Sequence, residues 1–467
     1  MIKKSLLIAI LSFALGLTSC GSSGSSFSYT SFPDTGEEIY ENDDVGFEID
    51  SVLNFSGGHY NMSCSYSDNY FLKDAKNYNK SLAELSFASS TETVRIDRAL
   101  SFLGECHFKD PRPIGYEDNN DKDCAYFLAH KPVKEYELFT VQIRGFDYGR
   151  EWASNFRVGN EGDHEGFYYA ASKVYKELNS YINKYHNGKK IKLWINGYSR
   201  AGAISNVLSS IILRNSNVLS INPSDMYVYT FEAPRGLTKE HAINYENVHN
   251  IINHDDFITC FAPEKYELYR CGVDVDVYSS NVSSVLSSFD EEILVPEYKV
   301  IEVTDELGKR ELHNDEEYIG FVYKCAFDNG YEDDQELLAN TREQYVTNYQ
   351  KHFETMFDIF FSLSLETRLS LVEEIGKKDR IAILSILISG TGMVNFLEPY
   401  LKKDNIGYNR DDLIHSFDFI RESLFTTFHP LLTSLLDSGV DNFYRMISTH
   451  MPEVSYNLMM NYHQNIK

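Results

Sequence analysis

The middle of the chain alternates between apolar strands and amphipathic helices. Apolar residues recur with a period near 3.6 over residues 167–182 and again over 204–212, which predicts two helices that each bury one face. Short apolar runs at residues 191–195, 226–231 and 248–252 predict buried strands. Strands and helices that alternate in this way are typical of a mostly parallel sheet covered on both faces, so we expect an α/β domain.

Weaker patterns precede this region. Residues 80–104 have helical spacing and end at Gly104, a residue type that favours helix ends. Residues 125–130 and 138–143 have the composition of strands. We therefore assign residues 71–280 to one α/β core.

The alternation stops near residue 280. Residues 281–340 are charged and irregular, and Phe- and Leu-rich helical runs follow to about residue 440. We expect residues 281–440 to form a mainly helical insertion, either a cap over a site or a side domain with its own core. Residues 441–467 then return to the α/β core. Residues 21–70 are acidic and aromatic, which predicts an irregular lead-in.

The first 20 residues have the pattern of an export signal. Lys3 and Lys4 precede a mostly apolar stretch of 12 residues, which is too short to span a bilayer. Residues 17–20 read Leu-Thr-Ser-Cys and resemble a bacterial lipobox. We expect cleavage before Cys20, lipid attachment there, and a protein tethered to the bacterial cell membrane outside the cytoplasm. A plain signal peptide with an incidental cysteine is the alternative.

Composition narrows the possible partners. Hydrophobic residues make up 43% of the chain, which excludes a mostly disordered protein. With 43 Lys+Arg against 69 Asp+Glu, the net charge is −26. Such a charge argues against nucleic acid as a partner and against electrostatic docking on anionic lipid.

Cysteine spacing predicts no metal site. Six cysteines follow Cys20, and their pairing is open between disulfides and buried free thiols. No Cys/His pair has zinc spacing. The acidic run at residues 118–123 lacks the glycine and terminal Glu of a calcium loop, so a solvated loop is the simpler interpretation.

The segment Gly197-Tyr198-Ser199-Arg200-Ala201 contains the principal chemical signal. It lies between a predicted strand and a predicted helix, where a sharp turn exposes a serine oxygen at the carboxyl end of the sheet. The residues two before and two after the serine must be small, and Gly197 and Ala201 meet that need. Ala201 departs mildly from the common GxSxG pattern. A nucleophilic serine is favoured over a structural tight turn.

Five segments follow one another along the chain: the Arg144-Gly145-Phe146 strand end with Trp152 and Asn155, the His164-Glu165-Gly166-Phe167 helix start, the Gly197–Gly202 turn, the TFEAPRG run at residues 230–236, and the run Asn253-His254-Asp255-Asp256. In this order they resemble the class 3 (fungal-type) lipases, an α/β-hydrolase family whose pattern at the fourth segment is TFGxPRxG. This resemblance implies an α/β-hydrolase fold and a Ser-Asp-His triad in that chain order.

The resemblance assigns Asp256 as the triad acid, with its neighbour Asp255 as the alternative. The histidine must follow in the chain. His450 stands before a Pro-Glu-x-x-Tyr run, resembling the ending of bacterial members of this lipase group, and His313 ranks second. The remaining candidates, which lie in predicted helical regions or at the C-terminus, are His352, His415, His429 and His463.

Two backbone N–H groups should form the oxyanion hole, from Arg200 and from Phe146. The family usually has Ser or Thr at the position of Phe146, so its side chain offers no hydroxyl support. Arg144 and Trp152 are interpreted as structural residues beneath the site.

Together these observations predict a membrane-tethered serine ester hydrolase acting on acylglycerols or related acyl esters, with no cofactor. Two alternatives remain: a phospholipase or acyltransferase with the same triad, and a non-catalytic binding lipoprotein on a hydrolase fold.

Overall fold

The structure is a computed structural model. It describes residues 44–51, 60–116, 124–145, 150–253, 256–260, 266–277, 303–305, 308–310, 342–426 with short gaps between 365 and 387, 450 and 452–465.

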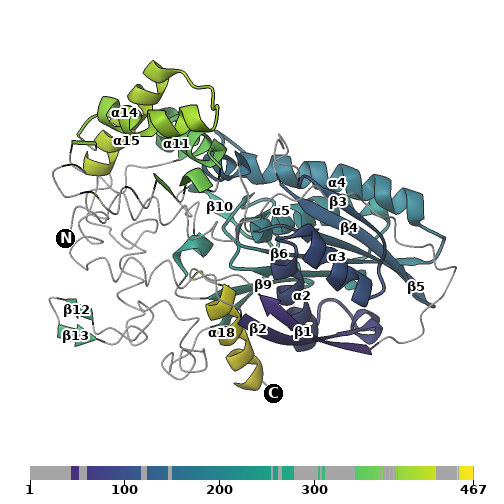
Figure 1. Ribbon diagram of the computed structural model, residues 1–467. Helices are drawn as coiled ribbons and strands as arrows, with labels where there is room; N and C mark the ends of the chain where they lie inside the picture. The colour runs from purple at the N-terminus through teal and green to yellow at the C-terminus, as the bar shows by residue number, and fades with distance from the viewer. Residues whose placement is uncertain are drawn as a thin grey trace.

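A seven-stranded sheet forms the centre of the molecule (Figure 1), in the order β11-β9-β7-β6-β5-β4-β3. The strands are β3 (Lys109–Ile114), β4 (Tyr126–Pro132), β5 (Tyr136–Ile143), β6 (Lys190–Tyr198), β7 (Met226–Phe231), β9 (Val248–Asn253) and β11 (Val273–Val277). Strands from β5 to β11 pair in parallel, while β3 and β4 are antiparallel. The expected mostly parallel sheet is confirmed. Its two edge strands, β3 and β11, were not predicted from the sequence.

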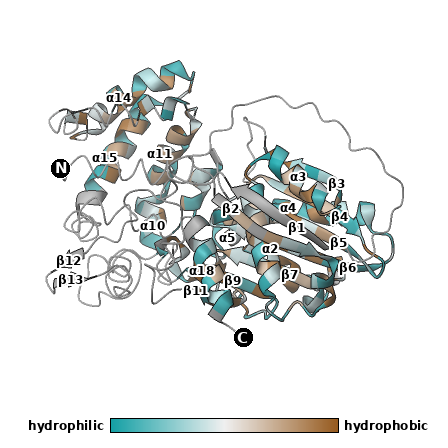
Figure 2. Cartoon of the chain, turned by 60° about the horizontal axis from the view of Figure 1, so that its bottom comes forward, coloured by the Kyte–Doolittle hydropathy of each residue, from teal (hydrophilic) through white to brown (hydrophobic). Residues whose placement is uncertain are grey.

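Helices cover both faces of this sheet. Helices α4 (Glu165–Tyr185) and α5 (Arg200–Arg214) pack on one face, and α2 (Lys80–Glu92), α3 (Ile96–Glu105) and α18 (Pro452–Asn465) pack on the other. Strand β6 shows why both faces are apolar: Leu193 and Ile195 face the α4/α5 side, while Trp194 and Tyr198 face the α2 side. Figure 2 shows hydrophobic residues concentrated in the strands of the sheet.

The N-terminal part differs from its prediction. Instead of an irregular lead-in, β1 (Asp44–Ser51) and β2 (Tyr60–Ser67) form an antiparallel hairpin, followed by η1 (Asp68–Leu72). The prediction was wrong here. Residues of β2 alternate in polarity, so the strand buries Met62, Cys64 and Tyr66 in the same core as α2. The helical spacing predicted over residues 80–104 corresponds to two helices, α2 and α3.

The helical part after residue 341 has a core of its own. Its longer helices are α10 (Arg342–Asn348), α11 (Gln350–Ser362), α14 (Gly390–Lys403) and α15 (Arg410–Thr426). This part packs on η2 (Arg150–Phe156) through stacked rings. Trp152 lies 5.1 Å from Phe361 with 12° between the ring planes, and Phe156 lies 4.5 Å from Phe357. The boundaries 281–440 and 441–467 remain predictions.

Short elements complete the description: α6 (Ser216–Leu219), η3 (Pro223–Asp225), β8 (Leu237–Thr238), η4 (Phe257–Cys260), β10 (Leu268–Tyr269), β12 (Val303–Asp305) and β13 (Gly308–Arg310). No helix in the described ranges is both long and apolar enough to cross a membrane. Cys64, Cys106 and Cys271 are buried free thiols, and Cys124 is also buried.

Candidate active site

Ser199 stands on a sharp turn between β6 and α5. Its backbone has φ 56° and ψ −126°, a combination that non-glycine residues rarely adopt. Its N–H donates to the Phe231 carbonyl at 2.7 Å, which ties the turn to the end of β7. The strained backbone is therefore held in place by the neighbouring strand.

Close backbone contacts explain the small residues around Ser199. A Cβ on Gly197 would lie 2.5 Å from the Ala201 carbonyl oxygen, and a Cβ on Gly145 would lie 2.2 Å from the Tyr198 carbonyl oxygen. Ala201 is itself fully buried, so its methyl group fits the position where the common pattern has glycine. The departure at Ala201 leaves the turn intact.

His450 and Asp256 meet Ser199 in a hydrogen-bonded chain. The Nε2 atom of His450 lies 2.8 Å from Ser199 Oγ, and its Nδ1 atom lies 2.5 Å from Asp256 Oδ2. The other oxygen of Asp256 accepts the N–H of Ile258 at 2.9 Å. All three side chains are at most 3% exposed. An Asp256 carboxylate requires a proton on Nδ1, which leaves Nε2 free to accept the serine proton.

Tyr198 connects the serine turn to His450 and to α18. Tyr198, the residue before the serine, donates its hydroxyl proton to the His450 carbonyl at 2.9 Å and lies 3.0 Å from the Ser455 hydroxyl in α18. No role for Tyr198 or Ser455 was predicted from the sequence. Their contacts join the serine turn to the histidine segment across 252 residues of sequence.

The side chain of Arg200 connects the serine turn to η2. Its Nη2 donates to Ser154 Oγ at 2.6 Å in a buried setting. Gly166 also touches η2 closely, because a Cβ there would lie 2.1 Å from the Ser154 carbonyl oxygen. Arg144 pairs with Glu151 of the same element at 2.9 Å. Arg144 and Trp152 thus have the structural contacts that were expected of them.

Several predicted residues lie outside the described ranges: Phe146, Asp255, His254, His313, His429, Cys20 and the acidic run 118–123. Arg200 is the first residue of α5, where a backbone N–H has no partner within the helix. Its assignment and that of Phe146 as oxyanion donors remain predictions.

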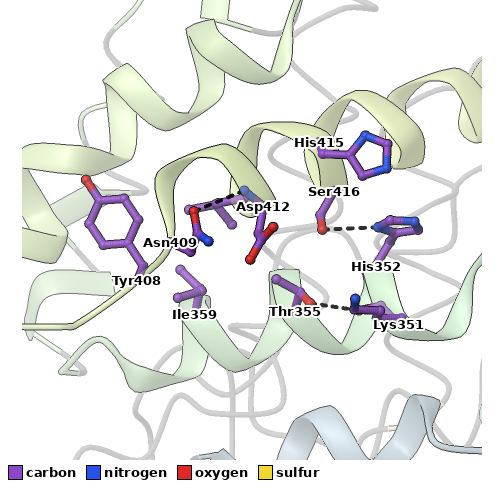
Figure 3. A pocket seen from close by; sticks show the side chains of 10 residues that line it. Lys351, His352, Thr355, Ile359, Tyr408, Asn409, Asp412, His415 and Ser416 are labelled. Atoms are coloured by element: carbon purple, nitrogen blue, oxygen red, sulfur yellow. Dashed lines mark hydrogen bonds between the residues drawn. The ribbon is translucent and has the colours of Figure 1, made fainter.

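The other candidate histidines make different contacts. His463 bonds to Tyr78 and Glu84, each at 2.7 Å. His352 and His415 line a pocket between α11 and α15, where His352 Nδ1 lies 3.1 Å from Ser416 Oγ (Figure 3). None of the triad residues lines this pocket. Within the described part of the chain, no cluster of His, Cys, Asp and Glu is arranged to hold a metal ion.

His164 is a second buried imidazole near the turn, and it caps α4. Its Nδ1 accepts the Phe167 N–H, and its Nε2 donates to the Asn155 carbonyl at 3.1 Å. Burial, together with the Arg200 and Arg342 charges, lowers the pKa of His164 to about 3 despite the bond to Asn155. The imidazole is therefore neutral when the protein is folded at ordinary pH.

This shift predicts acid sensitivity of the fold. Below the ordinary histidine pKa of 6.5, His164 binds a proton in the unfolded chain but not in the folded protein. The free energy of unfolding therefore falls as pH drops from 6.5 towards 3. Between pH 7 and pH 5 the loss from this residue is about 2 kcal/mol. Urea unfolding of wild type and His164→Asn, which keeps a capping side chain, checks this. An equal pH dependence in both proteins contradicts it.

The fold and the serine turn define the class of this protein: a serine hydrolase with an α/β-hydrolase fold. Residues 140–266 match the model of the family described as Lipase (class 3). This stretch of the chain is similar to the class 3 lipases, and the similarity supports a lipase or ester hydrolase. The match includes Ser199 and Asp256, whereas His450 lies beyond it.

Solved structures with a similar arrangement include several lipases. A fungal lipase in complex with an inhibitor is 15% identical, covers 42% of this chain and 79% of its own, and has a TM-score of 0.34. A triacylglycerol lipase whose catalytic centre is described as a serine protease triad is 16% identical, with coverage of 44% and 83% and a TM-score of 0.34. A lipase from Rhizopus microsporus var. chinensis is 14% identical, with coverage of 43% and 75% and a TM-score of 0.32. No curated protein sequence matches the chain.

Proposed function

We propose that this protein hydrolyses acylglycerols or related carboxylic esters through Ser199, His450 and Asp256. One observation carries the proposal: the three side chains form a continuous hydrogen-bonded chain although they come from residues up to 251 positions apart. An unbroken serine–imidazole–carboxylate chain on a strained turn weighs against a purely binding role. The class 3 family match supports an ester as substrate.

The proposed reaction has two halves. Ser199 Oγ attacks the carbonyl carbon of the ester while His450 Nε2 takes the serine proton, and the carbonyl π electrons move to its oxygen. The N–H groups of Arg200 and Phe146 stabilise this oxyanion. When the tetrahedral intermediate collapses, the C–O bond to the alcohol breaks and His450 gives its proton to the departing alkoxide. Water then attacks the acyl-serine with His450 again as base, which releases the acid and restores Ser199.

Asp256 keeps the imidazole in the required tautomer and stabilises the imidazolium that forms during each half. Its carboxylate is buried, so its charge acts on His450 with little screening by water. No step needs a metal ion or an organic cofactor.

The experiment that tests the serine uses a fluorophosphonate probe, which labels activated serines irrespective of the natural substrate. The protein from residue 27 onward is incubated with the probe beside its Ser199→Ala variant. We expect labelling of the first protein and none of the second. Equal labelling of both proteins, or of neither, contradicts the proposed nucleophile.

We also propose that the protein is exported and held at the bacterial membrane by a lipid on Cys20. The positive start, the short apolar stretch and the Leu-Thr-Ser-Cys ending support this. A tether at the membrane would bring the site close to lipid esters.

Replacing Cys20 with serine is expected to abolish incorporation of labelled fatty acid and to move the protein from the detergent phase to the aqueous phase in Triton X-114 partitioning. The change touches only the anchor, so hydrolysis of a soluble ester by the purified protein should be retained. Unchanged detergent partitioning of the Cys20→Ser protein contradicts lipidation at this residue.

A further inference from the structure

Glu232 is a buried acid beside the triad that the proposed reaction does not use. It follows β7 directly, it is fully buried, and its backbone has φ 48°, in the left-handed region that favours glycine. The lipase pattern TFGxPRxG has glycine at this position, whereas this chain has Thr230-Phe231-Glu232. Glycine adopts this backbone conformation with less strain than glutamate. A glutamate here indicates that its side chain has a function.

The position of Glu232 links all three segments that carry the triad. The preceding carbonyl, of Phe231, accepts the Ser199 N–H. The Glu232 Oε2 atom accepts the Asn253 N–H at 2.8 Å, at the end of the strand that leads to Asp256. The carboxyl group also interacts with the Asp256 carboxylate and with the Ser455 hydroxyl, which lies just after His450. Its second oxygen, Oε1, has no clear hydrogen-bond partner among the described residues.

Ionising both of two adjacent buried carboxyl groups has a high free-energy cost, because like charges repel and burial removes their hydration. Asp256 receives two hydrogen bonds, from His450 and from Ile258, which stabilise its charge. Glu232 receives the Asn253 N–H at Oε2 and also interacts with the Ser455 hydroxyl. Burial and, after it, the negative charge of Asp256 raise the pKa of Glu232 well above its ordinary value of 4.5. The shared proton therefore resides on Glu232.

We propose that Glu232 is a positioning residue for hydrolysis: as a neutral carboxylic acid, it uses Oε1–H to hold the ionised Asp256 against His450. This inference rests on the proposed triad. Oε2 is occupied by the Asn253 N–H, so the proton belongs on Oε1, the oxygen left to donate. The arrangement extends the chain from Ser199 through His450 and Asp256 to a fourth member at the end of β7.

Among the described residues, Asp256 is the charged group that acts on Glu232, and Ser455 is the polar side chain on α18 that does so. The guanidinium of Arg270 binds the carbonyls of Ala233 and Thr259 and pairs with Asp274. A charge on Glu232 would therefore act first on Asp256 and, through it, on its hydrogen-bond partner His450.

Two substitutions distinguish whether Glu232 acts as a neutral hydrogen-bond donor or as a negative charge. Glu232→Gln keeps a neutral donor and an acceptor in nearly the same shape, so kcat and KM should stay close to wild type. Glu232→Gly removes the side chain and suits the positive φ, so the backbone is relieved while kcat falls about tenfold or more with KM unchanged. Wild-type kcat in Glu232→Gly, or an equal fall in Glu232→Gln, overturns the proposal.

The pH profile supplies a readout that a purely structural role would not move. A neutral Glu232 contributes no charge to the site, so the acid limb of kcat/KM should coincide in wild type and Glu232→Gln. If Glu232 is instead ionised there, the substitution removes a negative charge and lowers the acid limb by about one pH unit. Such a shift overturns the proposal.

A spectroscopic measurement keeps this test separate from that of the triad. The infrared difference spectrum of wild type minus Glu232→Gln at neutral pH should contain the C=O stretch of one protonated carboxylic acid, and its absence overturns the proposal. Fluorophosphonate labelling of wild type runs in parallel. Failure of that labelling refutes the proposed nucleophile, whatever the infrared result shows for Glu232.

Discussion

Replacing Ser199 with alanine is expected to lower kcat for a carboxylic ester by a factor on the order of 10⁶, and His450→Ala should cost about as much. The two groups act as one unit, because the imidazole at 2.8 Å has no function without the hydroxyl that it deprotonates. The double variant should therefore be no slower than either single variant. Asp256→Ala should cost less, on the order of 10⁴, since an undirected imidazole retains some basicity.

The measurement is ester hydrolysis over several acyl-chain lengths, with two matched controls. Ser209 is another buried serine of α5, and its hydroxyl bonds only to the Ser205 carbonyl in the contacts described for it. His352 lines the separate pocket in Figure 3. Ser209→Ala and His352→Ala should retain the wild-type rate within a small factor. A His450→Ala protein with full activity refutes the assignment and returns the other imidazoles to consideration.

The sequence predicted the core of the fold because its signals are local. The stripe over residues 167–182 and the runs at 191–195, 226–231 and 248–252 correspond to α4, β6, β7 and β9. Each element buries an apolar face, so the period of the pattern follows from the geometry of the element. Strand β2 shows the limit. Its alternation was present at Tyr60–Ser67, but the acidic and aromatic composition of the surrounding segment favoured irregular chain.

Those parts of the site that belong to contiguous sequence motifs could be predicted. Ser199 is fixed by a strand, a turn and a helix that are contiguous in sequence. The hydrogen bond between Ser199 and His450 is a long-range contact. The order of the motifs indicated this contact, whereas the spacing of residues alone could not predict it. Glu232, Tyr198 and the Arg200–Ser154 bond escaped prediction because their roles depend on which atoms meet in space. The one available signal was Glu232 in place of the glycine of the family pattern.

The packing contact, or seam, between the helical part and η2 could likewise not be predicted from the sequence. Trp152 and Phe156 stack on rings about 200 residues later in the chain, and many Phe residues in α11 could have faced elsewhere. Because η2 also carries Ser154, the partner of Arg200, this seam lies one contact away from the serine turn.

Replacing Gly145 with alanine is expected to destabilise the fold by about 3 kcal/mol and to lower kcat roughly 100-fold. The added Cβ would lie 2.2 Å from the Tyr198 carbonyl oxygen and 3.1 Å from its carbon. Both are backbone atoms of the residue before Ser199, so the clash is relieved only by moving the turn that aims the nucleophile. Displacements near 1 Å are enough for such a loss of rate.

Gly104 provides the matched control for this steric argument. It lies inside α3, and a Cβ there would meet no atom within 4 Å. Gly104→Ala should therefore leave kcat unchanged and raise the free energy of unfolding by about 0.5–1 kcal/mol, because alanine loses less backbone entropy in a helix. Urea unfolding and ester kinetics on both variants decide the matter. If Gly145→Ala retains wild-type kcat and stability, then the end of β5 does not press on the serine turn, and the tight packing that holds Ser199 at its positive φ must come from Gly197 and β7 alone.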